Sequence, residues 1–157
     1  MKTVFVILMA LFFSSCFEQT DCLINNTNIL KIGLKGRTLG KDTTVTFLSI
    51  RTLEDETILY ENKNLSKVEV PLQISDTVTT VIFDYNESIV VSDTVQSIFV
   101  SDTLTLAYKN QTRVISRDCG AYLYQLDAYI PESTFEKVRV TSSILLTTVT
   151  INLEIFL

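Results

Sequence analysis

Cysteine is the residue type with the most chemistry to offer in this chain, which contains three: Cys16, Cys22 and Cys119. Histidine is absent, and its absence removes the commonest general base and the commonest transition-metal ligand. The four glycines form no phosphate-binding loop. Catalysis by a serine or by paired carboxylates stays open in principle, although no spacing indicates it. We therefore expect no catalytic residues, no cofactor and no metal site, and we expect that the protein is not an enzyme.

The first cysteine follows a segment with the three regions of a secretory signal. Lys2 supplies the positive charge, Val4–Phe13 is an unbroken apolar run of ten residues, and Ser14 and Ser15 precede Cys16. Ten residues are too few for a membrane-spanning helix, which needs about 20. We predict that residues 1–15 are a signal peptide that is cleaved in front of Cys16.

The sequence Phe13-Ser14-Ser15-Cys16 resembles a bacterial lipobox, the motif in which the cysteine thiol is acylated before cleavage. Phe13 departs from the usual leucine at its position. The resemblance implies acyl chains on Cys16, and each buried methylene contributes about 0.8 kcal/mol to membrane attachment. We expect a lipid-anchored protein of the cell envelope, at the outer membrane, with its periplasmic or surface orientation open. The alternative is ordinary secretory cleavage, with Cys16 unmodified.

Lipidation of Cys16 would leave two cysteines in an oxidising compartment. We predict that Cys22 and Cys119 form a disulfide. Closing a loop of nearly a hundred residues is worth about 4–5 kcal/mol in the chain-entropy model. Two free, buried thiols are the alternative.

The charge balance limits the partners that the chain can bind. Removal of Lys2 with the signal segment leaves 12 basic and 18 acidic residues, a net charge of −6. An acidic chain argues against binding nucleic-acid phosphates and against docking by charge onto anionic lipid. We therefore expect contact with the membrane through acyl chains on Cys16, a partner that is an envelope protein or a glycan, and no nucleic acid.

The tripeptide Ser-Asp-Thr occurs three times, beginning at Ser75, Ser92 and Ser101. Asp and Ser favour turns, and Thr followed by an aliphatic residue favours entry into a strand. A calcium site is the sharper alternative, but one Asp per loop does not supply the several oxygens that calcium needs. We interpret the three copies as turns that lead into strands.

The pair Asp-Thr followed by an aliphatic residue or Thr also resembles the acceptor motif of a bacterial O-glycosylation system that modifies exported proteins. The resemblance implies that the four matching threonines are candidate O-glycosylation sites. They are Thr43, Thr77, Thr94 and Thr103.

The elements that must position these residues are predicted to be strands. The 157 residues suggest one domain, 46% of them are hydrophobic, and Val, Ile, Thr, Tyr and Phe dominate after residue 28. Alternation of apolar and polar residues predicts strands near 30–35, 45–50, 57–60, 68–72, 78–85, 88–91, 96–100, 103–108, 113–116, 121–130, 138–140 and 148–156. We predict an all-β, antiparallel β-sandwich of immunoglobulin or fibronectin type over residues 28–157. A small β-barrel is the alternative, and residues 16–27 form a lipid-anchored tether.

Four local details of this interpretation can be checked. Pro71 cannot donate to a strand ladder, so its strand is predicted at a sheet edge. Residues 109–112 are predicted to turn and return as a hairpin, and Pro131–Lys137 could form one turn of helix. The last strand is predicted to be half exposed. Tyr122, Tyr124 and Tyr129 could form a binding face for a glycan or peptide, although packing is the more frequent role of such rings.

A resemblance to a known family rests on elements spread along the chain. They are Cys22 after the lipobox, Val70-Pro71-Leu72, Asp102-Thr103-Leu104, Tyr108, Ile115-Ser116, Cys119-Gly120 and Asn152-Leu153-Glu154-Ile155-Phe156. With these features the sequence resembles a family of small uncharacterised lipoproteins of Gram-negative bacteria, known as a domain of unknown function. The resemblance supports lipidation and the disulfide and implies no activity and no catalytic residues.

We favour a lipid-anchored binding or scaffolding module of the cell envelope. The reasons are the expected lipid anchor, the β-rich domain and the lack of a recognisable set of catalytic residues. Two alternatives stay open. One is a periplasmic or surface enzyme that uses carboxylate or serine chemistry. The other is a purely structural envelope protein.

Overall fold

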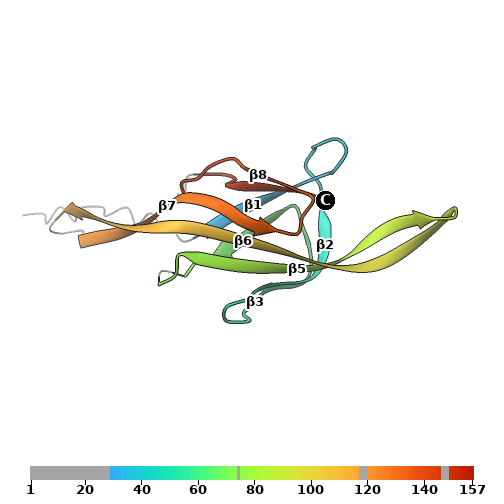
Figure 1. The fold of residues 1–157 in the computed structure, drawn as a ribbon, viewed down its shortest axis with the longest axis horizontal. Helices are drawn as coiled ribbons and strands as arrows, with labels where there is room; N and C mark the ends of the chain where they lie inside the picture. The colour runs from blue at the N-terminus through green and yellow to red at the C-terminus, as the bar shows by residue number, and fades with distance from the viewer. Residues whose placement is uncertain (1–28, 74, 117–119, 146–148) are drawn as a thin grey trace, which may run out of the picture.

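The computed structural model describes residues 29–73, 75–116, 120–145 and 149–157, and these residues form strands and no helix (Figure 1). The strands are β1 (Ile29–Lys35), β2 (Val45–Thr52), β3 (Ile58–Leu65), β4 (Lys67–Pro71), β5 (Val78–Val91), β6 (Thr94–Ser116), β7 (Gly120–Ser133), β8 (Lys137–Val140) and β9 (Leu153–Phe156). The predicted signal segment, the predicted lipidation site Cys16 and the predicted Cys22–Cys119 disulfide lie outside the described residues. The described part of the chain contains no helix, and therefore no helix there that could cross a membrane.

Two sheets make up the fold. The four-stranded sheet has the order β4-β1-β9-β8, and the five-stranded sheet has the order β3-β2-β5-β6-β7. All neighbours are antiparallel except β1 and β9, which run parallel. The prediction of an all-β sandwich is confirmed, and the barrel alternative is wrong because neither sheet closes on itself.

The core lies between the sheets and follows from the period of two along each strand. Leu30, Ile32 and Leu34 of β1 are buried, while Lys31, Gly33 and Lys35 alternate with them on the outer face. Phe83 of β5 packs against Phe47 of β2 and against Phe135 in the β7–β8 connection. The distances between ring centroids are 5.8 Å to Phe47 and 5.3 Å to Phe135. Burying each such side chain contributes about 1.5–3 kcal/mol.

The turn predicted at residues 109–112 is wrong. β6 runs without a break from Thr94 to Ser116, and β7 pairs with it across this region, with Asn110 opposite Gln125 and Gln111 opposite Tyr124. Lys109, Gln111 and Thr112 are exposed. These side chains are polar because this part of the long β6–β7 ribbon is exposed to water. They do not mark a turn.

The turn of helix predicted over Pro131–Lys137 is also wrong. β7 continues through Pro131 to Ser133 and β8 begins at Lys137, so only three residues connect them. Thr134 donates its backbone N–H to the carbonyl of Thr103 on β6, and Phe135 is buried against Phe83. These two contacts to neighbouring strands hold an extended conformation that outweighs the local preference for a turn.

The four-stranded sheet confirms one prediction and corrects another. β4, which contains Pro71, is an edge strand as predicted. β9 is not half exposed, because it lies between β1 and β8 and all four of its residues are buried. Glu154 on its outer side is covered by charged neighbours, and Phe156 is covered by Lys137, whose Nζ lies 4.4 Å from the ring centroid.

Candidate functional site

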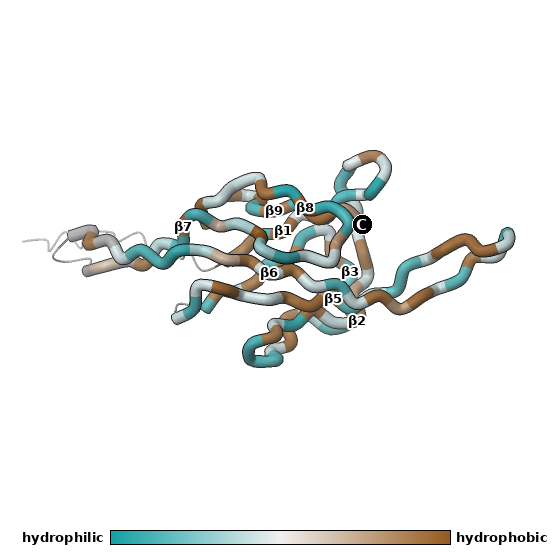
Figure 2. The backbone as a smooth tube through the Cα atoms, viewed as in Figure 1, coloured by the Kyte–Doolittle hydropathy of each residue, from teal (hydrophilic) through white to brown (hydrophobic). Residues whose placement is uncertain are grey.

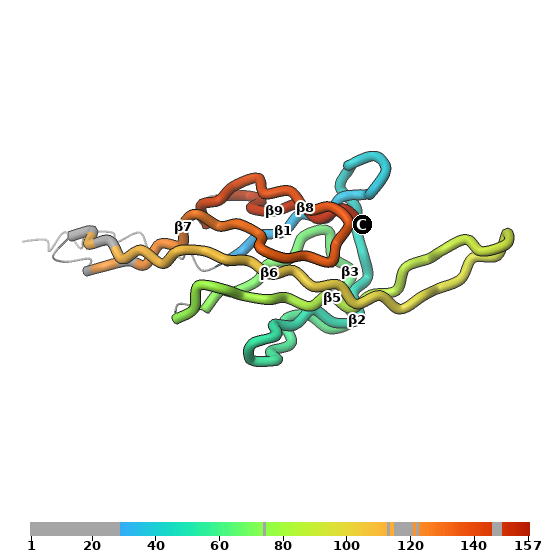
Figure 3. Tube along the Cα trace, in the orientation of Figure 1, coloured from blue at the N-terminus to red at the C-terminus, as the bar shows by residue number. Residues whose placement is uncertain are grey.

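The most distinctive feature of the molecule is a two-stranded ribbon that projects beyond the sandwich, formed by residues 86–99 of β5 and β6 and called the arm below (Figures 1 and 3). Its pairing runs from Asn86 opposite Phe99 to Val91 opposite Thr94. Ser92 and Asp93 turn the chain at the tip with φ of 48° and 63°. Two consecutive positive φ angles match the twist of a tight hairpin.

The arm exposes apolar side chains on both faces. Brown stretches on both strands of the arm in Figure 2 mark these hydrophobic residues. Val90, Val95 and Phe99 share one face and are 72%, 73% and 63% exposed. Val91 and Ile98 lie on the opposite face and are also exposed. A two-stranded ribbon alone is marginally stable in water, and contiguous exposed apolar surface marks interaction sites.

The outer backbone edges of the arm extend past the ends of β2 and β7, the strands that pair with β5 and β6 in the sandwich. β2 pairs with β5 only as far as Tyr85, and β7 pairs with β6 only from Leu104 onward. Among the described strands, none pairs with either outer edge of residues 86–99. Such edges can accept an additional strand from another chain.

A buried tyrosine attaches the arm to the body. Tyr85, which is 5% exposed, packs edge to face against Phe47 and donates its hydroxyl hydrogen to Asp102 at 2.7 Å. Thr134 donates to the same carboxylate at 2.7 Å. Burial, followed by the Asp102 carboxylate, raises the pKa of Tyr85 well above its ordinary value. The phenol therefore stays neutral and keeps its role as a donor.

A pocket of about 360 Å³ lies beside the base of the arm. Val45, Leu48, Tyr85 and Leu157 contribute to its apolar part. Arg37 also lines it and forms ion pairs of 3.3 Å with Glu87 and 3.2 Å with Glu136. Exposed pairs of this kind contribute about 0–1 kcal/mol, so a ligand carboxylate could compete for the guanidinium. The pocket offers charge and apolar contact, with the hydroxyls of Thr44, Thr46 and Ser88 also in its lining.

The best serine–carboxylate cluster lies on the outer face of the five-stranded sheet. Asp84 accepts hydrogen bonds from Ser101 at 2.6 Å and Ser49 at 2.7 Å, and Arg51 Nε lies 3.6 Å from it. Burial acts to raise the pKa of Asp84, but the two hydroxyls and the arginine outweigh it and hold the pKa below its usual value. A carboxyl with a lowered pKa is a weaker base, so this shift does not favour activation of either serine.

The candidate threonines occupy four different environments. Thr94 is exposed at the tip of the arm, where its hydroxyl donates to the carbonyl of Val91 at 2.6 Å, and Thr77 is exposed just before β5. Thr43 and Thr103 are only partly exposed, and Thr103 lies within paired β6. Whether any of them carries a glycan stays a prediction.

The Ser-Asp-Thr prediction holds for two of its three copies. The copy at Ser92 forms the turn of the arm, and the copy at Ser75 leads into β5. The copy at Ser101 is wrong, because it lies inside β6 opposite residues 82–84. Within the described ranges, no group of three His, Cys, Asp or Glu residues could hold a metal ion.

Sequence reasoning identified the strands of the arm but missed its exposure. Residues 88–91 and 96–100 were predicted as short strands, and Ser92-Asp93 between them is a hairpin signal. Their valines and isoleucines have the composition of a buried pair. Of the tyrosines considered as a binding face, Tyr124 is half-buried and Tyr129 is 58% exposed on β7. The side chain of Tyr122 lies outside the described part.

Comparison with known proteins yields one match. A family model described as a family of unknown function (DUF6452) matches residues 44–157, most of the chain, from the residue before β2 to the last residue given. The matched region includes the arm, the pocket wall on β2 and the Asp84 cluster. No curated protein matches the chain, and no solved structure does.

Proposed function

Because the chain belongs to this family of unknown function, we propose its role from its own geometry: it is a binding or scaffolding module of the bacterial cell envelope that engages a partner protein through its arm. Acyl chains on Cys16 hold the module at the membrane in this proposal. The observation that carries the proposal is the projecting ribbon with exposed Val90, Val95 and Phe99.

The chemistry of the arm favours a protein over a glycan. Sugar-binding faces rely on aromatic rings combined with polar groups. Residues 86–99 offer one ring, that of Phe99, and otherwise aliphatic side chains between polar ones. Aliphatic pairs such as Val90 and Val95, beside backbone edges to which another strand can add, fit a groove or a strand of a protein partner.

The location in the envelope is supported by the sequence. A charged start, an apolar run of ten residues and small residues before Cys16 have the order of a lipoprotein signal. Replacing Cys16 by Ala should release the protein from membranes in a wash of about 0.5 M salt, which screens contacts made by surface charge. Unchanged membrane retention of that variant would refute the anchor without bearing on the arm.

The arm is tested by site-specific photocrosslinking in the native membrane. A crosslinker at position 95 should yield a discrete adduct with one envelope protein, and a crosslinker at position 114 serves as a matched control. Val114 is an equally exposed valine of β6, at 74% against 73% for Val95, but it lies at the far end of the strand. No adduct at position 95, or the same adduct at both positions, contradicts the proposal.

A further inference from the structure

The outer face of the four-stranded sheet, called the basic face below, concentrates positive charge. Inward positions of β4, β1 and β9 are apolar and buried, and those of β8 are the partly buried Val138 and the exposed Val140, so the alternating residues point outward. Five of the outward residues are cations and two are carboxylates. They are Lys31, Lys35, Lys67, Lys137 and Arg139, with Glu69 and Glu154.

This face has the opposite sign to the chain as a whole. Five cations and two carboxylates give it a net charge of +3, and Asp42 at its rim lowers that to +2. The whole chain has a net charge of −5, so the residues outside the face and its rim carry −7. The average composition, which argues against contact with anionic lipid, therefore conceals a local concentration of positive charge on this face.

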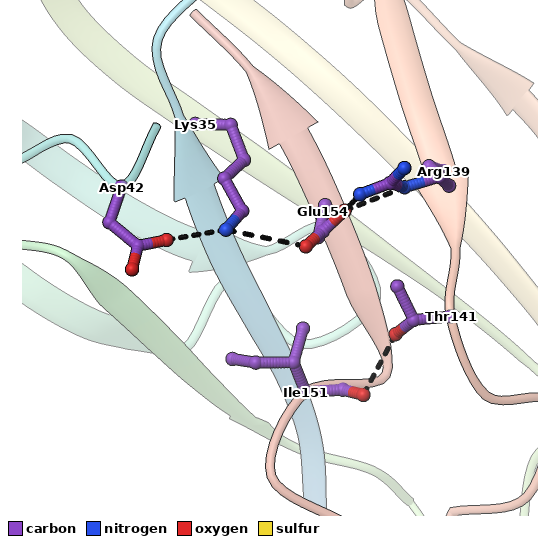
Figure 4. Close-up of polar contacts among 6 residues, drawn as sticks. All are labelled: Lys35, Asp42, Arg139, Thr141, Ile151 and Glu154. Carbon is purple, nitrogen blue, oxygen red and sulfur yellow. Dashed lines mark hydrogen bonds and ion pairs between the residues drawn. The ribbon is translucent and has the colours of Figure 1, made fainter. Parts of the chain in front are cut away.

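Ion pairs inside the basic face neutralise its buried carboxylate and leave cations at the surface (Figure 4). Glu154 has a side chain only 11% exposed; it lies 3.4 Å from Lys35 Nζ and accepts hydrogen bonds from Arg139. Lys35 also contacts Asp42. The Arg139 side chain is 59% exposed, and Lys137 is exposed. One carboxylate thus holds two cations in place, and the charge left over is positive.

We propose that the basic face docks on an anionic phospholipid surface. The sheet offers a broad face rather than a pocket, and its charge is complementary to lipid phosphates. Each Lys or Arg near such a surface adds to binding, and the effect falls off within a Debye length. The proposal rests on the proposed lipid anchor for its location.

The position of β1 agrees with this orientation. β1 is an inner strand of the four-stranded sheet and begins at Ile29, thirteen positions after Cys16. Thirteen residues span at most about 45 Å when fully extended. An anchor on Cys16 is therefore close enough in the chain for this sheet to rest on the membrane surface.

The same orientation leaves the arm accessible. The arm continues β5 and β6 of the five-stranded sheet, the other layer of the sandwich (Figure 1). Packed sheets lie about 10 Å apart. A module resting on its basic face would present the other layer, and the arm that extends it, to a partner protein.

The test uses the mature chain with Cys16→Ser, which lacks acyl chains, and sedimentation with lipid vesicles. Wild-type charges should give binding to phosphatidylglycerol/phosphatidylcholine vesicles and none to pure phosphatidylcholine, and the binding should disappear when salt rises from about 0.02 to about 0.5 M. The variant Lys67→Glu/Lys137→Glu should lower the partition coefficient by about tenfold or more. Lys63→Glu/Lys109→Glu, the same charge change on the five-stranded sheet, should bind nearly as the parent does.

Three outcomes overturn the inference: no binding to anionic vesicles, equal binding to neutral vesicles, or an equal loss in both charge-reversal variants. Circular dichroism of each variant establishes that it is folded. Failure here leaves the anchor and the arm standing, because acylation is measured by intact mass of the native protein and the arm by crosslinking. A native protein without acyl chains removes the anchor whether or not the vesicles bind.

Discussion

Tyr85 and Asp102, seventeen residues apart on neighbouring strands, are joined by a hydrogen bond of 2.7 Å where the arm leaves the sandwich. The tyrosine ring belongs to the core, and its backbone is the last of β5 to pair with β2. A charged acceptor makes such a bond stronger than a neutral one. This contact therefore couples the exposed ribbon to the folded body.

Replacing Tyr85 by Phe should lower the free energy of unfolding by about 1.5–3 kcal/mol, because Asp102 loses one of its two hydroxyl donors in a partly buried place. Urea unfolding measures the change, and amide exchange should quicken in residues 86–99. Tyr129→Phe, which removes a hydroxyl from a side chain 58% exposed, is the control and should change little. Equal effects of the two substitutions would contradict the special role of Tyr85.

Acid should weaken the protein through Asp84. Its pKa in the folded state lies below the ordinary value of 3.8, so it stabilises the fold above that value, and the stabilisation is lost as the pH falls through the folded pKa. Urea midpoints at pH 7 and pH 3 should differ less in Asp84→Asn than in the wild type. Asp127→Asn, which removes an exposed carboxylate, should keep the wild-type difference. If the Asp84→Asn variant shows the same difference between its urea midpoints at pH 7 and pH 3 as the wild type, Asp84 is not the cause of the acid sensitivity.

Replacing Glu154 by Gln should destabilise the fold by about 1–3 kcal/mol, because two cations then lose the carboxylate between them in a mostly buried place. Thermal unfolding provides the measurement. Glu69→Gln is the matched control: its carboxylate is 48% exposed and pairs with Lys67 at 3.0 Å, so its loss should cost less than about 1 kcal/mol. A Glu154 variant as stable as the Glu69 variant would show that the central pair is not important.

Substitution of one buried and one exposed phenylalanine should distinguish an effect on stability from an effect on binding. Phe83→Ala should cost about 3–5 kcal/mol, because it leaves a cavity among Phe47 and Phe135. Phe99→Ala should cost little, since that ring is 63% exposed on the arm, but it should reduce crosslinking to a partner from position 95. Urea unfolding and the crosslinking yield measure the two effects. Unchanged crosslinking in a folded Phe99→Ala protein would argue against the arm as the contact surface.

The disulfide prediction is checked by mass. If Cys22 and Cys119 are bridged, the mature protein should gain two hydrogen masses on reduction and should resist alkylation before it. Loss of the bridge in Cys119→Ser should lower stability by about 2–5 kcal/mol. Alkylation of both thiols in the untreated, native protein would instead support the alternative of two free cysteines.

What could be predicted from the sequence is the part that local chemistry decides. Leu30, Ile32 and Leu34 alternate with polar residues, and this alternation specifies a half-buried strand whatever lies beside it. Pro71 lacks an N–H and therefore belongs at an edge. Ser92 and Asp93 tolerate a tight turn between two apolar runs. The β class, most strands and the hairpin follow from these local preferences.

Only the tertiary structure decided which faces meet water and which charges meet one another. Val90 and Val95 have the composition of a core pair, and they are exposed because the arm projects beyond the sandwich, away from the four-stranded sheet that packs on the core residues of β5 and β6 (Figure 1). Glu154 lies between Lys35 and Arg139 only because the last strand inserts, parallel, between β1 and β8. The identity of the neighbouring strand depends on contacts more than a hundred residues apart, and no local pattern of side chains contains that information.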